Sequence, residues 1–203
     1  MHEGTSLGIR SLTGSEARRH LDDVAALRIA VFREWPYLYV GDMDYERDYL
    51  AAYAASPRSV FVLALDGDRV VGASTGLPLV DDAPAFRAPF LARGQDPAQV
   101  FYFGESVLLA PYRGRGTGHA FFDRREAHAR RLGDFTSTAF AAVDRDPDDP
   151  RRPLDHRGNE ALWTRRGYVR RPELRMQLDW AEPGIGACSH ALTFWTRSLE
   201  PVA

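Results

Sequence analysis

A glycine-rich segment near the middle of the chain constrains the fold most strongly. Residues 112–118 read Tyr-Arg-Gly-Arg-Gly-Thr-Gly and lie between an apolar run at 100–109 and a stretch of helical periodicity at 116–132. Glycines at alternate positions let the backbone pass close to a ligand, because they carry no Cβ. The first turn of a helix presents free N–H groups and a positive dipole end, which attract anions. The segment predicts a strand–loop–helix unit that binds a phosphate group, most naturally a diphosphate.

The composition excludes several other uses of such a loop. All basic residues are arginine, so a Walker A loop, a pyridoxal Schiff base and a lysine general base are excluded. A single cysteine excludes an intrachain disulfide framework and a cysteine-rich metal centre, and we predict no metal. A net charge of −2 argues against nucleic acid as a partner. Apolar runs are far shorter than the roughly 20 residues of a membrane helix, so we expect a soluble cytoplasmic protein without a membrane partner.

The remaining patterns predict one mixed α/β (α+β) domain over residues 1–203, with about seven strands and about four helices. The predicted strands are 7–12, 59–65, 69–74, 100–109, 136–143, 174–180 and 191–198. One predicted helix begins after residue 13, and the other three cover residues 42–55, 116–132 and 154–166. A strand–helix–strand unit over 100–143 places its two strands parallel, because such crossovers return alongside the first strand. Residues 78–99 are rich in proline and contain Phe86, which predicts an insertion or lid rather than a linker.

The pattern Arg113-x-x-Gly116-x-Gly118, after a strand that ends Val107-Leu-Leu109 and Pro111, resembles the acyl-CoA motif of the GCN5-related N-acetyltransferases, the GNAT family. The resemblance covers nearly the whole chain. It implies acetyl-CoA, or another short acyl-CoA, as co-substrate, held in a gap where strands 100–109 and 136–143 splay apart. It also implies direct attack of a primary amine on the thioester, without an acyl-enzyme.

The implied donor site combines strand backbone, the loop and the first helical turn. Arg113 and Arg115 add fork-shaped donors for the phosphates. The N–H groups of residues 115–119 hold the diphosphate, and the pantetheine arm pairs with backbone near Val107 and Leu109. The full set is Val107, Leu108, Leu109, Arg113, Gly114, Arg115, Gly116, Thr117, Gly118 and His119.

Three side chains are candidates for proton transfer or amine binding. Glu105 lies inside the apolar run, where a carboxylate is costly unless it has a use or a partner; it is either a general base or amine anchor, or a structural ion-pair partner of an arginine. Asp144 follows the second parallel strand and either binds the amine or is a solvated loop acid. Trp163 occupies the position of the family's usual proton-donating tyrosine, and an indole N–H is no useful acid. We therefore expect His156, a tyrosine elsewhere or solvent to protonate the leaving thiolate.

Aromatic residues between the first two helices predict the acceptor pocket. The resemblance implies that this connection lines the pocket, and Trp35, Tyr37 and Tyr39 there suit an apolar or cationic small molecule. Phe86 of the insertion is a further candidate, and packing under a loop is the alternative for all four. An antibiotic, a polyamine, an amino acid and a protein N-terminus are compatible acceptors, and the insertion favours a small-molecule amine. The protein is a possible homodimer.

Two other functions compete with acetyl transfer. Gly72-x-Ser74-x-Gly76 matches the elbow of serine hydrolases, but Pro78 follows and no helix begins there, so we interpret the segment as a strand. The stronger alternative is a catalytically weak acyl-CoA-binding sensor or regulatory domain of the same fold. The missing tyrosine favours that alternative, whereas Glu105 and the aromatic pocket oppose it.

Overall fold

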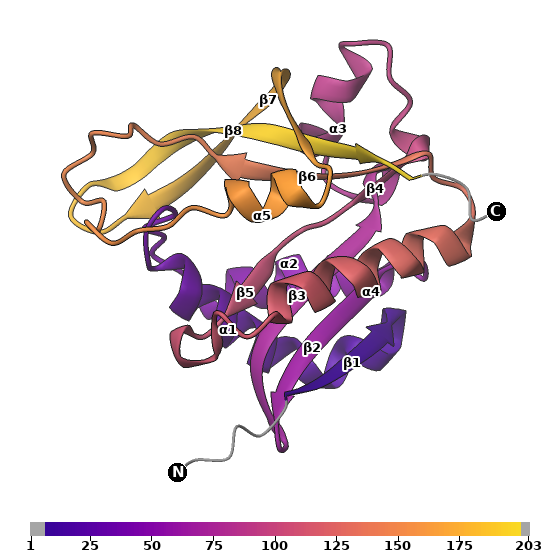
Figure 1. Cartoon of the computed structure of the whole chain (residues 1–203), viewed down its shortest axis with the longest axis horizontal. Helices are drawn as coiled ribbons and strands as arrows, with labels where there is room; N and C mark the ends of the chain where they lie inside the picture. The colour runs from indigo at the N-terminus through magenta and orange to yellow at the C-terminus, as the bar shows by residue number, and fades with distance from the viewer. Residues whose placement is uncertain (1–6, 200–203) are drawn as a thin grey trace.

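The computed structural model describes residues 7–199, so the first six and last four residues of the predicted domain lie outside the described residues. Within this range the strands form one mixed sheet of eight strands in the order β1-β2-β3-β4-β6-β8-β7, with β5 paired to β3 (Figure 1). The strands are β1 (Gly8–Thr13), β2 (Val60–Asp66), β3 (Arg69–Pro78), β4 (Val100–Tyr102), β5 (Ser106–Leu108), β6 (Ser137–Val143), β7 (Val169–Glu182) and β8 (Gly186–Ser198).

Helices cover both faces of the sheet. The α-helices among the described residues are α1 (Leu21–Phe32), α2 (Met43–Ala55), α3 (Pro84–Leu91), α4 (Thr117–Leu132) and α5 (Glu160–Arg165). Alternate residues of β2 enter different cores, as a strand requires: Phe61 and Leu63 pack toward α1 and α2, whereas Val60 and Val62 pack toward α4. The mixed α/β prediction is confirmed, with slightly more strands and helices than expected. No helix among residues 7–199 is long and apolar enough to cross a membrane.

The predicted central strand 100–109 is interrupted in the structure. β4 runs parallel to β6, as the crossover predicted, but β5 pairs only with β3. The break contains Gly104, where a Cβ would lie 2.6 Å from Thr75 Oγ1 and 2.8 Å from the Tyr53 ring. Only glycine fits this close approach, and the chain changes direction here. The predicted splay of the two parallel strands is therefore present, and it begins directly after β4.

Three further predicted elements differ from the structure in their bounds. The helix predicted over 154–166 is shortened to α5, because Gly158 and Asn159 are poor helix formers and Asn159 becomes the N-cap. β7 and β8 are longer than predicted, since each extends into a shared hairpin beyond the end of β6. The insertion contains α3, which is seated in the apolar layer: Phe90 packs against Phe194, with ring centroids 5.0 Å apart.

Candidate functional site

The splayed strands leave one backbone edge of β5 without a strand partner. Glu105 O accepts from Thr75 N–H at 3.2 Å, and Leu109 N–H donates to Val71 O at 3.0 Å. Because backbone groups alternate in direction along a strand, residues 105, 107 and 109 face β3, whereas Ser106 and Leu108 face the gap. Val107 and Leu109 were expected to pair with pantetheine, but their backbone groups face β3. The backbone groups that face the gap are those of Ser106 and Leu108.

The opposite edge of the gap is formed by β6. The last bond between the parallel strands joins Phe103 N–H to Ala139 O at 2.8 Å, so Ala141 and Val143 face the gap further on. The hydroxyl of Tyr102 lies beside the N–H of Ala141, and that of Tyr37 beside the N–H of Val143. Burial raises the pKa of both phenols, which keeps them protonated at neutral pH. The gap is thus bordered by backbone groups and by two hydroxyls.

The predicted phosphate loop joins β5 to α4. Its N-cap, Gly116, has φ of 84° and no side-chain cap, and Gly114 has φ of 76°. Both glycines adopt the left-handed conformation, and a Cβ at either would meet no atom within 4 Å. Within the described part of the chain, the backbone N–H groups of residues 114–118 donate no hydrogen bond to protein. Their free donors, the helix dipole and the open space above them fit an anionic group such as a diphosphate.

The two loop arginines have protein partners of their own. Arg113 Nε donates to Leu108 O at 2.9 Å, and its Nη1 lies 2.8 Å from Glu34 Oε2. Arg115 Nη2 donates to Pro111 O at 3.0 Å. His119, in the first turn of α4, has its Nδ1 3.5 Å from Arg166 Nη1. The backbone of the loop is therefore free to bind a ligand, whereas Arg113 and Arg115 brace the loop against its neighbours.

Glu105 lies in the break between β4 and β5 and points toward α1 and α2. Its Oε2 accepts from Arg28 Nη1 at 2.5 Å, and Arg28 Nε binds Glu46 of α2. Both carboxylate side chains are fully buried, and Oε1 of each has no hydrogen-bond partner among the described residues. We call Arg28, Glu46 and Glu105 the acidic triad. The triad places two carboxyl groups against one guanidinium, so each acid keeps an oxygen that a further donor could occupy.

Sequence reasoning missed Arg28 and Glu46, although one signal was available. Arg28 interrupts the apolar stripe of α1, and its guanidinium lies 4.3 Å from the ring centroid of Tyr49 and 5.0 Å from that of Phe32. Arg125 was missed in the same way: it shares the buried face of α4 with Phe121 and Phe122. A charge at a buried helical position predicts a polar partner across the interface.

Arg125 fixes the break in the central strand from the α4 side. Its Nη1 donates to Glu105 O at 3.0 Å and to Thr75 O at 3.2 Å, and its Nη2 donates to Ser106 Oγ at 2.9 Å. The guanidinium is almost fully buried, and burial lowers its pKa to about 10. At neutral pH it is still charged, and it holds the backbone carbonyl of Glu105 in place.

The predicted acceptor residues lie on the loop between α1 and α2. Tyr37 packs between Phe32 and Trp180, with ring centroids 4.5 and 5.9 Å away. Tyr39 lies beside Glu46, and burial together with that carboxylate raises the pKa of its phenol. Tyr37 thus borders the gap, and Tyr39 lies beside the acidic triad.

Three other predicted residues have different surroundings. His156 lies in the loop after β6 with its ring centroid 6.2 Å from that of Trp35, so the structure brings these two together. Phe86 packs on Tyr102 at 5.2 Å and is buried. Trp163, at the position of the missing tyrosine, packs between Phe140 and Trp195 at 4.9 and 5.1 Å. Trp163 is thus half-buried and packs against the core on the α4–α5 side of the sheet.

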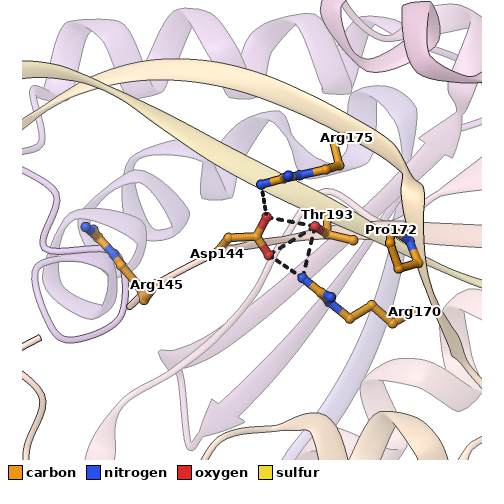
Figure 2. A pocket seen from close by; sticks show the side chains of 6 residues that line it. All are labelled: Asp144, Arg145, Arg170, Pro172, Arg175 and Thr193. Atoms are coloured by element: carbon orange, nitrogen blue, oxygen red, sulfur yellow. Dashed lines mark hydrogen bonds and ion pairs between the residues drawn. The ribbon is translucent and has the colours of Figure 1, made fainter. Parts of the chain in front are cut away.

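Asp144 follows β6 and lies in a pocket of about 250 Å³ on the α5 side of the sheet, shown in Figure 2. Its carboxylate accepts from Thr193 Oγ1 at 2.7 Å, from Arg170 Nη2 at 2.8 Å and from Arg175 Nη2 at 3.1 Å. Arg145 also lines the pocket. The arginine neighbours of Asp144 balance its charge. Thr193 alternates along β8 with core residues of the α1–α3 layer, so Asp144 lies on the sheet face opposite the acidic triad.

Known structures share this architecture over the whole chain. The N-acetyltransferase of Staphylococcus aureus Mu50 has a TM-score of 0.63 at 11% identity, covering 97% of this chain and 100% of its own. An acetyltransferase of the GNAT family from Streptococcus pneumoniae has a TM-score of 0.58 at 12% identity, covering 96% and 100%. Arabidopsis thaliana NAA60 in complex with acetyl-CoA has a TM-score of 0.59 at 11% identity, covering 96% and 99%.

Sequence comparison adds nothing to these structural matches. No family model matches the chain, and no curated protein is significantly similar to it. The structural matches, with their near-complete coverage, show that the chain has the fold of the GNAT acetyltransferases.

Proposed function

We propose that this protein transfers an acetyl group from acetyl-CoA to a primary amine of a small molecule. The observation that carries the proposal is the joining of two features at one end of the sheet: a row of free N–H groups at residues 114–118 and the unpaired edges of β5 and β6. The first suits a diphosphate and the second an extended arm with amide groups, and acetyl-CoA contains both. Acetyl-CoA bound to a structural neighbour of the same fold supports this choice of donor.

In the proposed reaction the pantetheine arm lies in the gap, and its thioester reaches the break between β4 and β5. The backbone groups left for the arm's amides are those of Ser106 and the N–H of Leu108 on one edge, and the carbonyls of Ala141 and Val143 on the other. Arg125 holds the turn that ends in Glu105 and therefore sets the direction of the neighbouring N–H groups. A strand N–H directed at the thioester carbonyl would stabilise the oxyanion that forms there.

Glu105 is the proposed general base. Arg28 fixes one of its oxygens and leaves Oε1 free to accept a proton from the acceptor ammonium. The neutral amine attacks the thioester carbonyl, the carbon–sulfur bond breaks and the nitrogen gives its second proton to water. The CoA thiolate then takes a proton from His156 or from a tyrosine at the gap, for which Tyr37 and Tyr102 are candidates.

The proposed acceptor is a cationic amine that reaches the gap from the α1–α2 side. The acidic triad provides carboxyl oxygens there, and Trp35, Tyr37 and Tyr39 provide aromatic faces. Aromatic rings and carboxylates together favour an ammonium group. On the opposite face, Asp144 is ion-paired with Arg170 and Arg175. A direct contact between Asp144 and the acceptor amine would require displacement of these arginines.

Calorimetric titration with acetyl-CoA tests the donor. We expect binding in the micromolar range, with dephospho-CoA and CoA as comparison ligands that keep the diphosphate. No binding at millimolar acetyl-CoA would contradict the proposal. Turnover is then measured as loss of thioester absorbance with a panel of amines. Binding without turnover on any amine would favour the sensor or regulatory alternative over the enzyme.

A further inference from the structure

A cluster outside the proposed acetyl-transfer machinery occupies the far end of the β7–β8 hairpin. Cys188, the only cysteine of the chain, has its Sγ 3.2 Å from His190 Nε2. The other ring nitrogen, His190 Nδ1, lies 3.6 Å from Glu182 Oε1. Glu182 lies on β7, which pairs with β8, the strand of His190. The side chain of Glu182 is 1% exposed. Thiol, imidazole and carboxylate are therefore aligned in that order along one face of two paired strands.

The order of these groups matches a nucleophile, a base and a carboxylate that orients the base. The Glu182 carboxylate faces Nδ1 at 3.6 Å, an electrostatic contact that favours a proton on that nitrogen and leaves Nε2 to accept the thiol proton. The Sγ also lies 3.7 Å from Trp180 O, a second acceptor for the S–H. The ring of Trp180 stacks on that of His190 at 3.7 Å and 13°, which fixes the plane of the imidazole.

The same three residues are less suited to a metal ion. Their ligand atoms lie within 4.8 Å of one another. However, the thiol approaches Nε2 and the carboxylate approaches Nδ1, and one ion can bind only one of these two ring nitrogens. Glu182 is also paired with Arg145, at 2.5 Å, and with Arg151. A cation would have to compete with two guanidinium groups for this carboxylate.

The charged groups around the cluster favour a neutral imidazole beside an ionisable thiol. Burial lowers the pKa of His190, and the nearby Arg145 lowers it further, against the opposite effects of Glu182, the Trp180 backbone and Asp179. The imidazole is therefore unprotonated at neutral pH and can take the proton of the thiol. Cys188 is partly exposed, so small reagents reach it.

We propose that Cys188 is an activated thiol and a modification site for low-molecular-weight disulfides, with His190 as its base and Glu182 as a positioning residue. The Cys188 thiol gives its proton to His190 Nε2 and its sulfur attacks one sulfur of the disulfide. A new sulfur–sulfur bond forms with Cys188 while the original one breaks. The leaving thiolate takes the proton from the imidazole, so Cys188 is oxidised and half of the disulfide is reduced.

The rate of reaction with dithiodipyridine, a neutral disulfide that releases an absorbing product, tests the proposal on the intact protein. Because the chain has one cysteine, the signal reports Cys188 alone. A free thiol with a pKa of about 8.5 is only about 3% ionised at pH 7. We expect Cys188 to react about tenfold faster than the thiol of glutathione at pH 7, with a rate that stays nearly constant down to about pH 6.

His190→Gln is expected to lower the rate at pH 7 about tenfold and to restore the steep pH dependence of an ordinary thiol. His20→Gln, which removes a histidine from the segment before α1, serves as the matched control and should leave the rate unchanged. Melting temperatures of both variants show that they are folded. A wild-type rate equal to that of glutathione, or an unchanged rate in His190→Gln, would overturn the proposal. Protection of the thiol by one equivalent of Zn²⁺, reversed by a chelator, would overturn it in favour of a metal site.

Discussion

The donor and acceptor sides of the proposed site are built from different kinds of atoms. The proposed donor side uses backbone N–H groups of one continuous segment, residues 106–118, and its glycines set the chain direction. The acceptor side uses side chains from three separate elements, gathered in the acidic triad of Arg28, Glu46 and Glu105. The donor side should therefore be sensitive to backbone conformation, and the acceptor side to the charge of individual side chains.

The largest expected effect is on the acceptor side. Glu105→Gln keeps the shape of the side chain and removes its ability to accept a proton, so kcat should fall about a hundredfold, the lower end of the contribution of a general base. Binding of acetyl-CoA, measured by calorimetry, should be unchanged, since the donor side does not depend on that carboxylate.

Glu46→Gln is the matched control for this comparison, because Glu46 shares Arg28 with Glu105 and is equally buried. We expect it to raise KM for the acceptor and to change kcat less than about fivefold, below the range of general base catalysis. Equal losses of kcat in the two variants, with equal losses of melting temperature, would instead show that the triad acts as a structural unit.

A smaller effect is expected from the backbone of the donor side. Gly116→Ala introduces a side chain at φ of 84°, and the cost of about 1–2 kcal/mol shifts the loop away from this conformation. The Kd for acetyl-CoA should rise about tenfold, while kcat at saturating donor changes little. Gly94→Ala is the control: Gly94 also has positive φ, 67°, and no atom within 4 Å of its Cβ position, but it follows α3. Similar rises in Kd for both variants would contradict a specific role of the loop.

Asp82 tests how the acceptor side affects stability. Its carboxylate accepts from Tyr53 O–H and Ala83 N–H, both at 2.7 Å, and burial raises its pKa to about 6. Since the folded-state pKa exceeds the ordinary value of 3.8, this group stabilises the fold below about pH 4, and the contribution is lost as pH rises through 6. Asp82→Asn should therefore raise the free energy of unfolding by about 1 kcal/mol at pH 8 and not at pH 4. Urea unfolding at both pH values measures the difference, and an equal change at both would contradict it.

The smallest effect is expected for the side chains of the phosphate loop. Arg115 is exposed and braces the loop through Pro111 O, so Arg115→Ala should weaken acetyl-CoA binding no more than about threefold, as for an exposed ionic contact. Titrations at low and high salt separate the charge effect from the conformational one. A loss as large as that of Gly116→Ala would mean that the arginine fork, and not the backbone, carries the recognition.

The difference between the two sides also explains what the sequence could predict. The strand–loop–helix unit around Gly116 is local, and its composition and spacing indicated both its fold and its ligand chemistry. The acidic triad joins residues 18 and 77 positions apart, and no local pattern specifies which arginine meets which acid. The splay of the two strands was predicted, but its position at Gly104 was not, because its cause is the close approach of Tyr53 and Thr75 from other elements. The roles assigned to Glu105, Asp144 and His156 stay predictions.

The strand order has a consequence for assembly. β1 and β7 are the outer strands of the sheet, so their free edges are the places where a second copy could add a strand. β7 carries Arg170, Arg171 and Arg175 near its bulge, together with Pro172, which has no N–H to offer. Charge, bulge and proline together prevent another strand from pairing along this edge. A homodimer of this chain would therefore join through a helical layer or through β1, and the β7–β8 hairpin would keep its outer edge in solvent.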